Sequence, residues 1–266
     1  PKTNSEVRFD VTSLTRGALR EVTQAFVQSD DQAKLPLEAF GAGTRCISSL
    51  AILALVARKR GHAIMAIEEP ETFLYPSAQR AIVTEIRTLA TQLFLTTHSP
   101  YALDLFGPDE ISVVSLNPDG HGRVLQPKTE NIKQRSRYKR LFRSGLSEAI
   151  LSPRALLVEG LSDSVFIKGF AEIASKKSVI SLDFDREGVA FVEGESIGEL
   201  TDIAEFLVSV DVETFITHDH TTDEAEQAKL ASCSVPAFDL HFSGMEKLLA
   251  TELQIDTIDQ VLSWET

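Results

Sequence analysis

The sequence has little cysteine and no long hydrophobic run, and each absence excludes a class of protein. Its two cysteines, Cys46 and Cys233, lack the paired spacing that forms a disulfide framework or a zinc site. No stretch approaches the roughly 20 apolar residues that span a bilayer. The first residues also lack a basic segment followed by an apolar run. We therefore expect a cytoplasmic protein with no membrane partner.

The composition is that of a globular protein with a sizeable core. Of the 266 residues, 43% are hydrophobic and 24% are charged. This length accommodates one large domain or two small ones, and we expect two.

Negative charge is concentrated in the second half of the chain. Residues 1–150 hold 19 Lys or Arg against 16 Asp or Glu, whereas residues 151–266 hold 7 against 23, and the net charge is −13. A carboxylate-rich half repels DNA phosphate unless divalent cations intervene. A basic stretch lies between the halves, and both a solvated linker helix and a contact to the DNA backbone remain open for it. Its cations are Arg123, Lys128, Lys133, Arg135, Arg137, Lys139, Arg140 and Arg143, against the single acid Glu130.

Apolar periodicity predicts parallel sheets in both halves. Strands and helices that alternate along a chain are typical of α/β folds, in which helices flank a parallel sheet. Strong turn residues at 117–120 predict a hairpin between the halves. In the first half the expected elements are a helix over 44–60 that stops at Gly61, a strand over 64–67, a helix over 77–91 and a strand over 93–97, followed by hairpin strands over 111–116 and 122–125. In the second half they are strands over 155–158, 189–192 and 214–217, helices over 162–174 and 196–209, and a last helix over 242–253 with Ser243 as its N-cap.

Carboxylates follow the first of these strands directly. Glu68 and Glu69 end the strand over 64–67, and His98 ends the next one. Hydrolysis of a γ-phosphate needs one carboxylate near Mg²⁺ and another that orients or deprotonates the attacking water, both held at a rigid strand end. An imidazole at the neighbouring strand end is placed to sense the γ-phosphate. Taken alone, each of these residues is better explained as a solvated residue at a strand end or in a loop.

A glycine turn opens the first helix. Gly41, Gly43, Thr44 and Arg45 begin it, so their backbone amides and the helix dipole can hold phosphate. Taken in order, this turn, the acidic strand end and the histidine resemble the signature, Walker B and switch elements of ABC ATPases. The run Ile67-Glu68-Glu69-Pro70-Glu71, followed by Leu74-Tyr75-Pro76, resembles the OLD (overcoming lysogenization defect) family in particular. The resemblance implies ATP and Mg²⁺ as cofactors, with Glu68 on the metal and Glu69 and His98 catalytic.

A glycine-rich loop ending in Gly-Lys-Ser or Gly-Lys-Thr is absent from the sequence. Without it an ABC-type site lacks its main triphosphate cradle. We expect that the chain begins within the ATPase domain, or that another chain supplies the loop in a homo-oligomer formed through this domain. ATP hydrolysis by this chain alone is therefore not expected.

The second half opens on the run Leu156-Leu157-Val158-Glu159-Gly160, with Asp163 three residues later. This run resembles the first motif of Toprim domains, most closely those of OLD-family nucleases, whose glutamate binds the catalytic metal. Toprim domains carry two aspartates at a later strand end, where this chain has Asp219 and, in the partner position, Thr221. Further on, Glu246 and Lys247 resemble the glutamate and lysine that complete OLD-type sites. The resemblance implies that Glu159, Asp163, Asp219 and Glu246 bind Mg²⁺ or Mn²⁺, with Glu159 and Lys247 catalytic.

Together these patterns predict an α/β protein with three segments. An ABC-type ATPase portion over 1–125 and a basic linker over 126–152 precede a Toprim domain over 153–266. The expected function is ATP-regulated, metal-dependent DNA cleavage in antiviral defence, with DNA and an effector or helicase protein as partners. One alternative is a non-catalytic sensor or scaffold with a decayed Toprim site, which Thr221 favours. A second is a recombination or repair ATPase with structural DNA binding, which the basic stretch favours.

Overall fold

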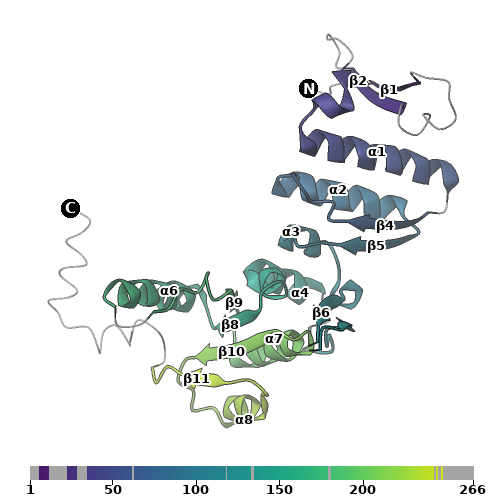
Figure 1. Ribbon diagram of the computed structural model, residues 1–266. Coiled ribbons are helices and arrows are strands. Elements are labelled where there is room, and N and C mark those ends of the chain that lie inside the picture. The colour runs from purple at the N-terminus through teal and green to yellow at the C-terminus, as the bar shows by residue number, and fades with distance from the viewer. Residues whose placement is uncertain are drawn as a thin grey trace. The chain divides into compact units, whose positions relative to one another are not determined.

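The chain forms two compact units, Pro1–Ala102 and Leu103–Thr266, and each is described by itself (Figure 1). No helix among the described residues is long and apolar enough to cross a membrane. The computed structural model describes residues 6–11, 23–28, 35–61, 63–117, 119–132, 135–178, 181–242, 244 and 247.

The first unit contains a small antiparallel sheet and an α/β layer. The antiparallel sheet has the order β1-β2-β3, and in the α/β layer β4 and β5 pair in parallel. The register runs from Ile64 opposite Gln92 to Glu68 opposite Thr96, so both strands end at the same edge. The elements are β1 (Glu6–Val11), β2 (Thr23–Gln28), β3 (Leu35–Pro36), the 3-10 helix η2 (Leu37–Ala39), α1 (Ala42–Arg60), β4 (Ile64–Glu68), α2 (Pro76–Leu89), β5 (Gln92–Thr96) and α3 (Pro100–Leu103).

The local sequence explains how α1 and α2 begin and end. Gly61 adopts a left-handed conformation with φ 72°, and its amide donates to the Ala57 carbonyl at 3.2 Å. The predicted helix stop is thus confirmed, because glycine takes this conformation without steric cost. Pro76 occupies the first turn of α2, where its missing N–H is not needed. Ala57, Met65 and Ile86 form a small buried cluster between the two helices and β4.

The second unit is built on a parallel sheet of order β11-β10-β8-β9, preceded by the predicted antiparallel hairpin. The predicted α/β fold with helix-flanked parallel sheets is confirmed. The predicted last helix over 242–253 falls largely outside the described residues. The elements are the 3-10 helix η3 (Pro108–Glu110), β6 (Val113–Leu116), β7 (Gly122–Leu125), α4 (Arg135–Leu141), a π-helix (Phe142–Leu146), α5 (Ser147–Ala149), β8 (Arg154–Val158), α6 (Leu161–Lys176), β9 (Val189–Glu193), α7 (Ile197–Ser209), β10 (Glu213–His218), α8 (Glu224–Ser232) and β11 (Ala237–Asp239).

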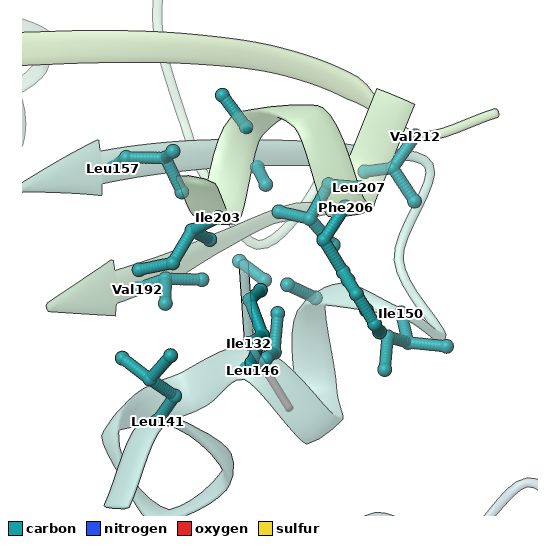
Figure 2. Packing of buried hydrophobic residues seen from close by; sticks show 14 of the residues in the cluster. Ile132, Leu141, Leu146, Ile150, Leu157, Val192, Ile203, Phe206, Leu207 and Val212 are labelled. Carbon is teal, nitrogen blue, oxygen red and sulfur yellow. The ribbon is translucent and has the colours of Figure 1, made fainter. Parts of the chain in front are cut away.

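Helices cover both faces of this sheet. Alternate residues of a strand point to opposite faces, so Val192 and Phe191 face opposite ways. Val192 lies in the main core with α7, whereas the ring of Phe191 lies 4.3 Å from the ammonium of Lys168 on α6. Figure 2 shows the core on the α7 side, where Ile203, Phe206 and Leu207 pack with Leu157 and Val192 and with Ile132, Leu141, Leu146 and Ile150.

The segment before β8 belongs to this core. Tyr138, Leu141 and Leu146 are at most 2% exposed, so the apolar face of the stretch predicted as a basic linker is buried. Gly145 has φ 108°, and a Cβ there would lie 2.1 Å from the Phe191 carbonyl oxygen. Only glycine fits at this approach of the π-helix to β9. The boundaries at 125 and 152 remain a prediction.

Ion pairs tie the same segment to the acidic half. Arg137 donates to Glu199 at 2.9 Å and to Asp202 at 2.7 Å, and Arg140 pairs with Glu199 and with Glu195. Burial would raise the pKa of Glu199, but hydrogen bonds from Arg140, the Glu195 amide and Arg137 outweigh it and lower that pKa. Another cation of the stretch, Arg123, pairs with Asp211. Three of the basic residues therefore neutralise acids of their own unit.

Candidate functional site

The carboxyl edge of β4 and β5 brings two predicted residues together. Glu69 follows β4, and its amide donates to the Thr96 carbonyl at 3.0 Å. Its Oε1 lies 3.5 Å from Nε2 of His98, which follows β5. Both side chains are largely exposed, at 47% and 85%. Because Glu68 is the last residue of β4, the three predicted residues occupy one edge of the sheet that is open to solvent.

A third carboxylate at this edge, Glu71, was not predicted. It is 9% exposed, and its Oε1 accepts hydrogen bonds from the Thr97 hydroxyl at 2.6 Å and the His98 amide at 2.8 Å. The one sequence signal was a third acid within Glu68-Glu69-Pro70-Glu71. The burial of Glu71 depends on the turn after Pro70, and the spacing of apolar residues does not predict that turn.

The predicted glycine turn lies at the start of α1. Gly41 is the N-cap in an extended conformation, and its carbonyl accepts from the Arg45 amide at 3.1 Å. The space around Gly41 is open, whereas a Cβ on Gly43 would lie 2.9 Å from the Phe73 carbonyl oxygen. Gly43 thus has a structural role, since it lets the first turn of α1 approach the loop after β4. Thr44 is exposed in this first turn, as is Arg45.

At the carboxyl edge of the second sheet, Glu159 and Asp219 meet. They follow the adjacent parallel strands β8 and β10, and the Asp219 amide donates to Glu159 Oε1 at 2.9 Å. Burial raises the pKa of the Glu159 carboxyl; the hydrogen bond from the Asp219 amide offsets part of this rise, and the nearby carboxylates of Asp219 and Asp163 add to it. A concentration of carboxylates that disfavour one another's charge suits a bound cation, which would relieve the repulsion.

Asp163 also has a structural role. It is 7% exposed at the start of α6, and its Oδ2 accepts from the Gly160 amide at 3.1 Å. This hydrogen bond caps the helix. The predicted metal-ligand role therefore competes with a capping role that the structure displays.

The region after Asp219 departs from the two-aspartate Toprim pattern. The Thr221 hydroxyl donates to Glu226 at 2.5 Å, and Asp223 caps α8 by accepting from the amides of Ala225 and Glu226. Asp223 thus has a structural role as the N-cap of α8. Within the described ranges, no three His, Cys, Asp or Glu side chains form a group that could hold a metal ion. Of the predicted residues that complete the site, Glu246 lies outside the described residues, and Lys247 is described and exposed.

Two further acids on this edge were not predicted. Glu193 ends β9, opposite Val158, and accepts from the Ser164 hydroxyl at 3.2 Å. Asp239 ends β11 and lies 2.9 Å from His220 Nδ1. The predicted second strand stopped at 192, one residue before Glu193, and the short strand β11 was not predicted. In the strand order β11-β10-β8-β9, the edge carries Asp239, Asp219, Glu159 and Glu193.

The carboxylate oxygens of Glu159 and Asp219 suit a hard divalent cation, and a complete ligand set would need residues beyond the described ones. Carboxylate oxygens are the ligands that Mg²⁺ and Mn²⁺ prefer. Glu159 and Asp219 are already adjacent, and burial, with a smaller contribution from the neighbouring carboxylates, raises the pKa of Glu159.

Two family models match the chain. Residues 2–104 match the model described as "AAA domain, putative AbiEii toxin, Type IV TA system". Residues 150–220 match "Overcoming lysogenization defect protein-like, TOPRIM domain". A curated relative, the OLD nuclease of Thermus scotoductus, is 26% identical over 163 residues. That match covers 58% of this chain, and the chain spans only 30% of the relative's length.

Solved structures of SMC ATPase heads also match, at low similarity. An SMC ATPase described for ATP-driven dimerization and DNA-stimulated activation is 14% identical with a TM-score of 0.36, covering 51% of this chain and 81% of that one. An Smc head domain derived from Pyrococcus yayanosii is 14% identical with a TM-score of 0.35, covering 52% and 25% of the two chains. The two family matches carry what can be said: residues 2–104 are similar to AAA-type ATPase domains and residues 150–220 to OLD-like Toprim domains.

Proposed function

We propose that this chain forms the catalytic part of an ATP-regulated, metal-dependent DNA endonuclease. The observation that carries the proposal is the hydrogen bond between Glu159 and the Asp219 amide, which gathers two acids from distant segments at one sheet edge. The OLD nuclease relative and the matched Toprim model support the same interpretation.

In this proposal Glu159 and Asp219 hold Mg²⁺ or Mn²⁺, assisted by Asp163 and by Glu246. The ion, when bound, would activate water and steady the leaving oxygen of a phosphodiester. Burial raises the pKa of the Glu159 carboxyl, which makes it a better proton acceptor than an ordinary glutamate. Lys247 would stabilise charge that builds on the scissile phosphate.

The ATPase half would act as the regulatory site. In this proposal Glu68 binds the nucleotide's Mg²⁺, Glu69 orients water and His98 senses the γ-phosphate. The amides at the start of α1, around Gly41 and Thr44, would contact phosphate together with Gly43 and Arg45. Because the sequence has no Gly-Lys-Ser or Gly-Lys-Thr loop, we expect no ATP turnover by the purified chain. Sustained phosphate release above a Glu69→Gln control would contradict this expectation.

The nuclease proposal is tested by nicking of supercoiled plasmid with Mg²⁺ or Mn²⁺. Glu159→Gln keeps an acceptor oxygen for the Asp219 amide but removes a charged ligand, so cleavage should fall by about 100-fold or more. The matched control is Glu172→Gln, which removes an exposed acid of α6 and should leave the rate unchanged. Equal cleavage by the wild type and Glu159→Gln would remove the nuclease assignment.

A second candidate is a non-catalytic scaffold with a decayed Toprim site. It is favoured by the use of Thr221 as a donor to Glu226, at the position where Toprim domains carry an acid. Titration calorimetry with Mn²⁺ separates the two candidates. A working site binds Mn²⁺, and Asp219→Asn weakens this binding, whereas a decayed site shows no binding that depends on Asp219.

For the biological setting we propose antiviral defence in the cytoplasm, with DNA as the substrate. Homo-oligomers would form through the ATPase half, and an effector or helicase protein would be a further partner. Sedimentation of the chain with and without ATP and Mg²⁺ tests the first of these associations. A single monomeric species under both conditions would argue against it.

A further inference from the structure

The strand end that carries His98 is held by a chain of hydrogen bonds. The Thr97 hydroxyl and the His98 amide both donate to Oε1 of Glu71, at 2.6 and 2.8 Å. The Ser99 amide in turn donates to the Thr97 hydroxyl at 3.0 Å. Thr97 and His98 thus bind Oε1 of Glu71 directly, and Ser99 is linked to the same oxygen through the Thr97 hydroxyl.

The same network reaches α2. The Ser99 hydroxyl donates to Gln79 Oε1 at 2.6 Å, and Gln79 Nε2 donates to the Leu74 carbonyl at 2.7 Å. Ser99 is 6% exposed, so these bonds lie where water competes little and each is harder to break. The loops after β4 and β5 therefore hold each other through side chains as well as through the sheet.

Glu71 provides this connection from the β4 side. It is nine-tenths buried, and its other oxygen, Oε2, has no hydrogen-bond partner within the described part of the chain. Its Oε1 accepts from the residues on either side of the Thr97-His98 peptide. Burying a carboxylate is unfavourable because the charged group loses its hydration. A buried acid also does not serve solubility, so its hydrogen bonds to the loop are the role that the structure displays.

We propose that Glu71 is the positioning residue that sets His98 against Glu69. Glu69 is fixed by its own amide, which donates to the Thr96 carbonyl at 3.0 Å. The 3.5 Å separation between the Glu69 carboxylate and the His98 imidazole then depends on where Glu71 holds the His98 amide. The importance of this pair for ATP hydrolysis rests on the proposed function, whereas the geometric dependence does not.

The test is a double substitution followed by NMR of the His98 ring in the whole chain. At one fixed pH, Glu69→Gln should shift the ring ¹⁵N resonances of His98, which are assigned with His98→Gln. In a Glu71→Ala background the same Glu69→Gln change should shift them at least twofold less, because the two side chains no longer have a fixed separation. An equal shift in both backgrounds would overturn the proposal. Glu85→Ala, which removes an exposed acid of α2, is the matched control and should leave the response unchanged.

A second variant covers the case in which Glu71→Ala does not fold. Glu71→Gln keeps a neutral acceptor in place of the carboxylate, and neutral acceptors form weaker hydrogen bonds. Amide hydrogen exchange at His98 should then be at least threefold faster than in the wild type, and unchanged exchange would overturn the proposal. Neither measurement uses nucleotide, metal or DNA. A failed nuclease assay therefore does not affect this inference. Likewise, failure of the NMR or exchange test does not affect the nuclease proposal.

Discussion

Glu199→Gln should destabilise the second unit substantially, because it removes the charge that pairs with two arginines. These arginines lie about 60 residues earlier in the chain. Glu199 is 5% exposed. One of its carboxylate oxygens accepts from Arg137 and Arg140, and the other accepts from the Glu195 amide at 2.9 Å. A glutamine amide has only one acceptor atom. Whichever way it turns, an NH₂ group faces either the guanidinium groups or the amide.

The size of the effect follows from the hydrogen bonds that the substitution removes. Hydrogen bonds to a buried charged group contribute about 1.5–3 kcal/mol when one is removed. The two arginine side chains keep 26% and 37% of their surface in solvent, so they are rehydrated in part when the carboxylate is replaced. We therefore expect a decrease of about 2–3 kcal/mol in the free energy of unfolding, or roughly 5–10 °C in Tm for a unit of this size.

Urea denaturation at neutral pH measures this decrease, with Glu172→Gln as the exposed-acid control. A Glu199→Gln midpoint equal to that of the control would refute the reasoning. The pH dependence gives a second check. The folded pKa of Glu199 lies below the ordinary value of 4.5, so its contribution is complete above that value and is lost as the pH falls through the folded pKa. The difference between wild type and variant should shrink accordingly in acid.

Three other substitutions test the same structure. Tyr138→Phe should raise stability by about 1 kcal/mol in thermal denaturation, because the Tyr138 hydroxyl is buried without a hydrogen-bond partner in the described part of the chain; a lower Tm would contradict this. Gly145→Ala should lower the free energy of unfolding by at least about 3 kcal/mol, or prevent folding, because the alanine Cβ would collide with the Phe191 carbonyl oxygen. A thermal melt equal to that of the wild type, followed by circular dichroism, would contradict this. Glu159→Gln should raise Tm at neutral pH in EDTA, because the raised pKa of Glu159 means that its charged form destabilises the fold. That gain should vanish as the pH falls below the ordinary glutamate value of 4.5, and a gain that persists there would count against the electrostatic cause.

The meeting of residues at neighbouring strand ends could be predicted from the sequence. Glu69 and His98 follow predicted parallel strands, as do Glu159 and Asp219, and in each pair the structure brings the two residues together. Parallel strands end at one edge of a sheet, so predicting the strands was enough to predict that the residues following them lie close together. Glu193 was missed because the predicted strand stopped one residue early, and periodicity predicts the existence of a strand better than its boundaries.

By itself, the sequence determined most of the parallel strands and the helices between them, the acidic strand ends and the absence of a Gly-Lys-Ser or Gly-Lys-Thr loop. These are local properties, carried by spacing and by glycine and proline. Only the tertiary structure decided that Glu71 is buried and accepts a hydrogen bond from the His98 amide, and that Arg137 and Arg140 neutralise Glu199. Both outcomes depend on burial and on partners distant in the chain. A charged residue therefore looks the same in sequence whether it faces water, DNA or another side chain of its own unit.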